Sequence, residues 1–231
     1  KRANAIKLMA RFLYMEMKKM PLALAQIDCG KAHNAIPREG SMTFAVPAAR
    51  KEEVKADWNI FVSDVAEEYH ATEGRQDMTL GSAERQPVIE ADAARRIILT
   101  LQAIDNGVFN MCQDEELAWL VETSSNLAIV NIGGGKASVK ILARSASESQ
   151  KECIANMLES CFCMAGMKVT LSGDYQGWDP NPDSEMIRVM SGIYSREFGK
   201  EPKVNVVHAG LECSVILSKY PGLDIVSFGP T

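Results

Sequence analysis

Apolar residues recur at three- and four-residue steps along the first twenty positions of the chain, at Ile6, Met9, Leu13, Met17 and Met20. On a helix this spacing gathers the apolar side chains into one stripe, so the pattern predicts a helix over residues 3–20. Pro21 follows directly and ends that helix. The same periodicity predicts further helices over residues 47–70, 91–104, 145–165, 183–198 and 211–218.

Shorter apolar runs between these helices predict strands. The runs are residues 22–29, 41–46, 108–111, 126–132, 137–142, 169–171, 204–207 and 223–227. Residues 41–46 alternate between polar and apolar side chains, which is typical of a strand in an antiparallel pair. Gly133-Gly134-Gly135 separates two of the runs and favours a tight hairpin. A phosphate-binding loop fits less well, because Lys136 precedes Ala137 and a strand rather than Ser or Thr and a helix.

A change in composition divides the chain near residue 173. Residues 173–182 are rich in glycine, proline and aromatic side chains, which is typical of a connector. Before it, hairpins and amphipathic helices indicate an α+β domain over residues 1–173, with an antiparallel sheet covered by helices. After it, alternating strands and helices favour a partial α/β segment over residues 174–231. Because the chain starts without Met and stops just after an apolar run, we expect both ends to be cuts through a larger fold.

Composition limits the classes of function that fit the chain. Its 231 residues are 46% hydrophobic and 24% charged, with a net charge of −5, as expected of a soluble globular protein. No stripe of Lys and Arg with interleaved aromatic residues is present, so we expect no nucleic-acid partner. No apolar run approaches the ~18 residues that a membrane span requires. The six cysteines form no C-x-x-C pair, and we interpret them as reduced, mostly buried thiols of a cytoplasmic protein.

The segment His208–Cys213 concentrates an imidazole, a carboxylate and a thiol where a predicted strand gives way to a predicted helix. Such junctions are common ligand-binding positions in α/β proteins. His208 and Glu212 are four residues apart and could share a helical face, but no H-E-x-x-H motif accompanies them. Metal ligation, ligand binding without metal and a purely structural helix start therefore all remain open from the residues alone.

Two further polar residues stand beside predicted strands. Asn34 lies in a loop between two strands, where its amide could donate to a carbonyl or a carboxylate, although asparagine is also an ordinary turn former. Arg144 ends a predicted strand, where it could bind an anion or could simply be solvated or paired.

Six segments spread over the chain carry a resemblance to a known family. They are Arg2–Leu8, Asn34–Glu39, Leu120–Leu127, Gly173–Ser184, His208–Cys213 and Ser227–Thr231. Together they resemble the bacterial aminoacyl-histidine dipeptidases, which are di-zinc metallopeptidases related to carnosinase and peptidase T. In that family an inserted lid, or dimerisation, domain splits the catalytic domain. The resemblance implies that residues 1–173 form the lid and residues 174–231 form part of the returning catalytic domain.

The resemblance also implies roles for individual residues. Glu212 matches the position that holds the free α-amine of the dipeptide. Asn34 matches a lid position that reaches the substrate from the partner subunit, and Arg144 aligns with a lid arginine that binds the substrate carboxylate. His208 belongs to the same segment as Glu212 and joins this substrate-binding set without a defined role. Ser214 departs from the family pattern, which has Gly after Glu-Cys, and this suggests altered packing beneath the site.

The family's metal-binding residues match no position in the present sequence, so the resemblance implies two zinc ions in the parent enzyme and none in this fragment. We expect no catalytic residue in the fragment and no activity from it alone. The parent is expected to be a cytoplasmic homodimer that hydrolyses Xaa-His and other dipeptides. The alternative is a non-catalytic peptide-binding or assembly module.

Overall fold

The computed structural model describes residues 2–113, 115, 118–174, 181, 183–204 and 212–229. The chain divides into two compact units. Unit 1 comprises Lys1–Gly107, Ser125–Leu142 and Leu158–Val169, and unit 2 comprises Val108–Ser124, Ala143–Met157 and Thr170–Thr231.

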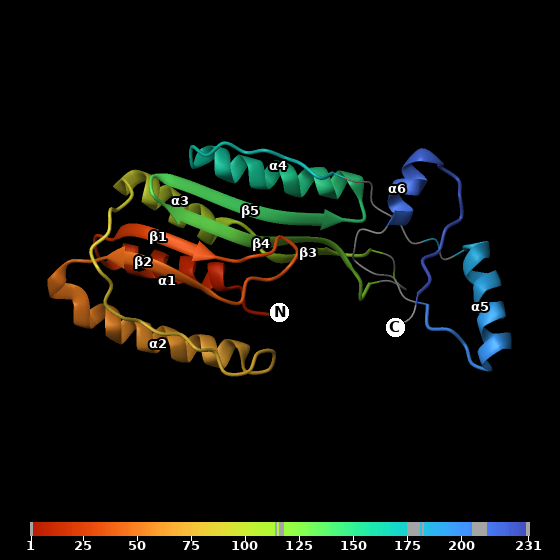
Figure 1. Cartoon of the computed structure of the whole chain (residues 1–231), viewed down its shortest axis with the longest axis horizontal. Coiled ribbons are helices and arrows are strands. Elements are labelled where there is room, and N and C mark those ends of the chain that lie inside the picture. Colours follow the sequence, from red (N-terminus) through yellow and green to blue (C-terminus); the bar gives the residue numbers. More distant parts are fainter. Residues whose placement is uncertain are drawn as a thin grey trace. The chain divides into compact units, whose positions relative to one another are not determined.

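The chain folds into helices and strands in an order close to the one that its periodicity predicts (Figure 1). The helices are α1 (Ala5–Lys19), the short 3-10 helix η1 (Ala48–Arg50), α2 (Lys51–Tyr69), α3 (Ala91–Ala103), α4 (Glu148–Met164), α5 (Glu185–Phe198) and α6 (Glu212–Lys219). The strands are β1 (Ala23–Cys29), β2 (Gly40–Ala45), β3 (Gly107–Met111), β4 (Val121–Gly133) and β5 (Lys136–Ser145).

The strands form one sheet in the order β2-β1-β4-β3, with β5 also paired to β4. β1 is antiparallel to both of its neighbours, and Ile27 pairs with Met42 on β2 and with Ile132 on β4. β4 and β5 are joined through Gly134 and Gly135, whose φ angles of 56° and 76° suit a tight turn. The predicted α+β class, an antiparallel sheet with helices, is therefore confirmed.

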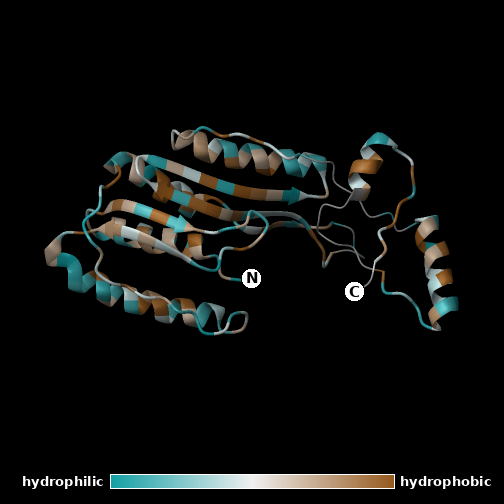
Figure 2. Ribbon diagram, viewed as in Figure 1, coloured by the Kyte–Doolittle hydropathy of each residue, from teal (hydrophilic) through white to brown (hydrophobic). Residues whose placement is uncertain are grey.

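An apolar cluster of unit 1 lies where α1 packs against α2. Phe12 is fully buried there, and its ring meets Trp58 edge-on at 4.9 Å and Phe61 at 5.3 Å between centroids. α1 contacts both α2 and α3, and α1 and α3 together cover one face of the sheet through β2 and β1 (Figure 1). Figure 2 shows polar and apolar residues in alternating bands along α2, as expected of a helix with one face on this cluster.

The first turn of α1 is held by two polar side chains that reach far along the chain. Asn4 caps the helix, because its Oδ1 accepts from the backbone N–H groups of Ile6 and Lys7 at 3.0 and 3.2 Å. Its Nδ2 donates to the carbonyl of Leu127 at 2.9 Å. Lys7 Nζ lies within 2.9 Å of three carbonyl oxygens at the C-terminal end of α3, those of Leu101, Gln102 and Ile104. A cation at this end also complements the helix dipole.

Three of the predicted strands are not found as strands among the described residues. Residues 169–171 and 223–227 carry strand-like apolar runs but form no strand, because a strand requires a hydrogen-bonded neighbour and the described residues supply none to them. Of residues 204–207, only Val204 is described, and it is not in a strand. β4 starts at Val121 rather than at residue 126, because its first residues are polar and hide the strand from a hydrophobicity pattern.

Two smaller expectations were also wrong. α4 begins at Glu148 rather than beside Ser145, because Ser145 still belongs to β5 and its hydroxyl lies 2.7 Å from that of Thr123. The thiols are not mostly buried, because only Cys29 of the six is buried while Cys153 and Cys163 are exposed. Burial raises the pKa of the Cys29 thiol to about 12.

The segment after residue 173 contains long-range hydrogen bonds of its own. Ser184 caps α5 by accepting from the N–H of Ile187 at 3.1 Å, and its hydroxyl donates to Asp224 at 2.6 Å. The second oxygen of Asp224 accepts from the N–H of Met186 at 2.8 Å. These bonds lower the pKa of Asp224, with the Ser184 hydroxyl contributing most. Asp224 therefore completes the N-terminal cap of a helix that starts 39 residues earlier in the chain.

A carboxylate is buried where α1 meets α2. Glu16 has no exposed surface, and its nearest ionic partner is Lys19 at 3.3 Å, which bonds Asp57 more closely at 2.7 Å. Within the described residues its Oε2 atom has no hydrogen-bond partner. Burial raises the pKa of Glu16 and the negative charge of Asp57 adds to this, whereas Lys19 acts in the opposite direction. The charged form of Glu16 is therefore unfavourable in the folded state.

Glu16→Gln is expected to raise the free energy of unfolding at neutral pH by about 1 kcal/mol, because it removes a desolvated charge and leaves the Lys19–Asp57 pair intact. A carboxyl with a raised folded pKa destabilises the fold as pH rises from its ordinary value through the folded value. Urea unfolding from pH 4 to pH 9 should show this decline in the unaltered chain and less of it in the variant. Glu52→Gln is the control, because Glu52 is exposed and Lys55 lowers its pKa. Its contribution to stability changes only below the ordinary pKa of a glutamate, so this variant should keep the decline of the unaltered chain above that value. Equal slopes in the unaltered chain and the Glu16 variant would contradict the expectation.

Candidate functional site

Asn34 lies in the loop between β1 and β2. Its side chain is exposed and, within the part of the chain that the structure describes, makes no hydrogen bond. The loop turns at this point, and the N–H of Ala35 donates to the carbonyl of Ala32 at 3.4 Å. The amide of Asn34 is therefore available to a group outside the unit.

Three contacts hold this loop against the rest of unit 1. Gly30, with φ of 85°, leaves β1 so close to β4 that a Cβ atom there would lie 1.9 Å from the carbonyl oxygen of Ala128. Asn126 on β4 donates from Nδ2 to the carbonyls of His33 at 3.2 Å and Ala35 at 2.8 Å. Further along, the carbonyl of Pro37 accepts from the N–H of Ala5 at 2.9 Å. Asn126 was not singled out from the sequence, although it lies within the segment Leu120–Leu127 that carries the family resemblance.

Arg144 is the last residue but one of β5 and is half-buried. The strand end beside it is fixed, because Ser145 and Thr123 are hydrogen-bonded and the N–H of Ala146 donates to the carbonyl of Glu122 at 3.1 Å. Nearby in sequence, Lys151 Nζ lies 2.7 Å from both Glu148 and Asp174. Burial is the largest single effect on the pKa of Lys151 and lowers it, but the bonds and charges of Asp174 and Glu148 together outweigh burial, so the pKa is raised.

The remaining candidates lie near the C-terminal end of the chain. Glu212 is the first residue of α6, and His208 lies outside the described residues. Arg144 and Glu212 belong to unit 2 and Asn34 to unit 1, so each is described within its own unit. Cys213 and Ser214 follow Glu212 in α6; Cys213 is a half-buried free thiol, and Ser214 is buried.

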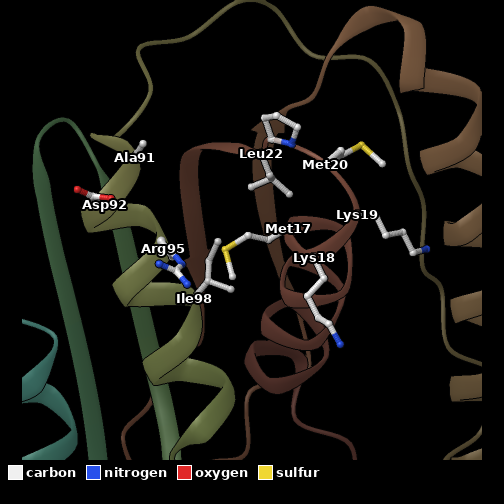
Figure 3. A pocket seen from close by; sticks show the side chains of 10 residues that line it. Met17, Lys18, Lys19, Met20, Leu22, Ala91, Asp92, Arg95 and Ile98 are labelled. Atoms are coloured by element: carbon white, nitrogen blue, oxygen red, sulfur yellow. The ribbon is translucent and has the colours of Figure 1, made fainter.

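A separate hollow of about 430 Å³ lies between the end of α1 and the start of α3. Figure 3 shows Met17, Arg95 and Ile98 pointing into the space between the two helices, with Lys18 and Lys19 pointing away from it. The N-terminus of α3 is already capped by Glu90, whose two carboxylate oxygens accept from the N–H groups of Asp92 and Ala93 at 2.8 Å. None of the candidate substrate residues lines this hollow.

The described residues show neither a metal-binding cluster nor a membrane span. They contain no group of three or more His, Cys, Asp or Glu side chains placed to hold a metal ion. None of the helices among them combines the length and the apolar character of a membrane span.

Comparison with known proteins shows what this chain is similar to. A family model described as a peptidase dimerisation domain matches residues 1–73. The "Cytosol non-specific dipeptidase" of Escherichia coli (strain K12) is 33% identical over 229 residues, which are 99% of this chain and 47% of that protein. The solved structure of "Aminoacylhistidine Dipeptidase from Vibrio alginolyticus" superposes with a TM-score of 0.87 at 34% identity. This chain is a partial homologue of these dipeptidases.

The match covers nearly all of this chain but less than half of each relative. The superposition covers 100% of the present chain and 47% of the Vibrio enzyme, so the chain spans about half the length of each relative. The family model of the peptidase dimerisation domain matches the first third of the chain, residues 1–73. The predicted resemblance to these dipeptidases is confirmed by both the sequence and the fold.

Proposed function

We propose that this chain is the lid and part of the catalytic domain of a metal-dependent dipeptidase that hydrolyses Xaa-His and other dipeptides. The observation that carries the proposal is the match of the whole chain to an aminoacylhistidine dipeptidase at 34% identity and a TM-score of 0.87. Within this proposal, residues 1–173 are the lid and residues 174–231 the catalytic segment. The fragment itself supplies dimerisation and substrate recognition.

The substrate contacts proposed here follow the chemistry of a dipeptide with free ends. Glu212 holds the α-amine, because a carboxylate and an ammonium form a charge-assisted hydrogen bond. Arg144 holds the carboxylate through its planar guanidinium fork. Asn34 donates its amide to the substrate from the lid of the partner subunit, and its exposure on an anchored loop supports this role. His208 completes the set by its position beside Glu212 in sequence.

Zinc enters the proposal only through the parent enzyme. The described residues do not fit a zinc centre, because they contain no cluster of suitable ligands. We assign the ligands of both zinc ions to parts of the parent protein outside the present sequence, because the family's metal-binding residues match no position in this chain, and we assign no metal-dependent step to it. The dimerisation region at residues 1–73 supports a homodimer, and the cytosolic E. coli relative supports a cytoplasmic location.

The full-length protein that contains this chain is expected to hydrolyse Ala-His in the presence of Zn²⁺, whereas the 231-residue chain alone is not. Glu212→Gln in the full-length protein should lower kcat/KM for Ala-His about 100-fold, because it removes the charge that faces the ammonium. Release of free histidine, followed by chromatography, measures both effects.

N-acetyl-Ala-His provides the matched control, because its blocked amine carries no charge for Glu212 to recognise. The variant should lose most of its discrimination between the free and the acetylated dipeptide. Glu201→Gln, an exposed carboxylate just beyond α5, should leave kcat/KM unchanged. A full-length protein without peptidase activity but with peptide binding would instead support the alternative of a non-catalytic binding or assembly module.

A further inference from the structure

Asn126 binds the backbone on both sides of Asn34. A single amide nitrogen, Nδ2 of Asn126, donates to the carbonyl of the residue before Asn34 and to that of the residue after it, at 3.2 and 2.8 Å. These partners lie 93 and 91 residues away along the chain. Asn126 thus connects the middle of the sheet to the turn that carries Asn34.

The side chain of Asn126 continues the connection between two strands after their backbone pairing stops. β1 and β4 pair at Ile27, Asp28 and Cys29, and Cys29 opposite Val130 is the last pair. Beyond it the chain turns away at Gly30, against the carbonyl of Ala128. Asn126 lies farther along β4 in the same direction, where its amide reaches the departing loop.

The position of Asn34 is set through its backbone. Its own side chain makes no hydrogen bond to the described residues, and the one hydrogen bond between backbone groups of its turn is long, at 3.4 Å. Asn126 Oδ1 is shielded from solvent and has no partner among the described residues, so the side chain acts through its donor group. Removing that donor frees both carbonyls that flank Asn34.

We infer that Asn126 is a positioning residue for substrate recognition, which holds the Asn34 amide where it meets the dipeptide. This inference rests on the proposed function of Asn34. Asn126 does not touch the substrate itself; it acts by fixing the geometry of a group that does. A displacement of about 1 Å at such a group can cost on the order of 100-fold in rate.

Asn126→Asp in the full-length protein tests the inference, because aspartate has the same shape and offers no N–H donor. We expect kcat/KM for Ala-His to fall about 10- to 100-fold, with most of the loss in kcat. Hydrogen exchange in residues 30–37 should accelerate while that in β5 stays unchanged. Asn131→Asp is the matched control: Asn131 lies on the same strand, and its amide bonds the side chain of Asp28 at 2.7 Å, away from the loop. It should keep kcat/KM within about twofold.

A double-mutant cycle with Asn34→Ala separates positioning from general destabilisation. If Asn126 acts through Asn34, the double variant should be no less active than Asn34→Ala alone. Multiplied losses, or an Asn126→Asp enzyme that keeps its activity, would overturn the inference and leave the proposed function standing. If the Asp variant folds poorly, Asn126→Ser serves in its place. The shorter serine side chain does not reach the two carbonyls, so it should cause the same loss of kcat/KM. An unaltered protein that cleaves no dipeptide would overturn the proposed function, and the inference with it.

Discussion

Phe12→Ala is expected to lower the free energy of unfolding by about 3–5 kcal/mol, which is among the largest effects of a single side chain in this protein. Phe12 has no exposed surface, and its ring contacts those of Trp58, Phe61 and Phe44 at centroid distances of 4.9, 5.3 and 6.2 Å. Truncation removes the ring from all three and leaves a cavity at the junction of α1, α2 and β2. Urea denaturation followed by tryptophan fluorescence reports on the cluster directly, because Trp58 is part of it.

The same substitution at Phe198 is the control. That ring is 64% exposed at the end of α5 and contacts Tyr194 at 4.6 Å, so its loss should cost less than about 1 kcal/mol. Phe12→Leu keeps an apolar side chain in place and should fall between the two. A Phe12→Ala variant as stable as Phe198→Ala would show that α1 and α2 are not held together by this aromatic cluster.

The elements with strong periodicity were the ones that the sequence predicted well. α1 and α3 carry apolar stripes that can be read without any knowledge of their partners, and both formed within about two residues of the expected ends. The glycine hairpin between β4 and β5 was equally local in origin. The predicted strands that did not form have a physical cause in common. Residues 223–227 have the composition of a strand, but strand formation depends on a neighbour that lies elsewhere in the chain.

Local sequence patterns also do not predict which side chains form hydrogen bonds to distant segments of the chain. Lys7 resembles any polar residue on a helix, yet it binds the end of α3 some 94 to 97 positions later. Asn126 sits in a polar stretch that hid the first half of β4, and its partners lie more than 90 residues earlier. The residues alone left Asn34 open between a donor to a ligand and an ordinary turn former, and only its family segment gave it a specific role. The roles of Asn34, Arg144, Glu212 and His208 stay predictions.

Gly30→Ala is expected to lower the free energy of unfolding by about 3 kcal/mol and to displace the loop that carries Asn34. With φ of 85°, alanine would first meet the backbone penalty of the left-handed region, about 1–2 kcal/mol. Its Cβ would then lie 1.9 Å from the carbonyl oxygen of Ala128, 3.0 Å from its carbonyl carbon and 3.1 Å from Cα of Ile129. These are backbone atoms of a central strand, which cannot rotate aside as a flexible side chain would, so the loop must move instead.

Gly81→Ala is the matched control, because a methyl group added at Gly81 would meet no atom within 4 Å and the backbone there is not left-handed. Its stability should change by less than about 0.5 kcal/mol. The two variants separate stability from positioning: at a temperature where both are folded, Gly30→Ala in the full-length protein should still hydrolyse Ala-His more slowly. A rate equal to that of Gly81→Ala would mean that β1 and β4 can shift apart without moving Asn34. The close approach at Gly30 and the amide of Asn126 would then be independent features, rather than two anchors of the same loop.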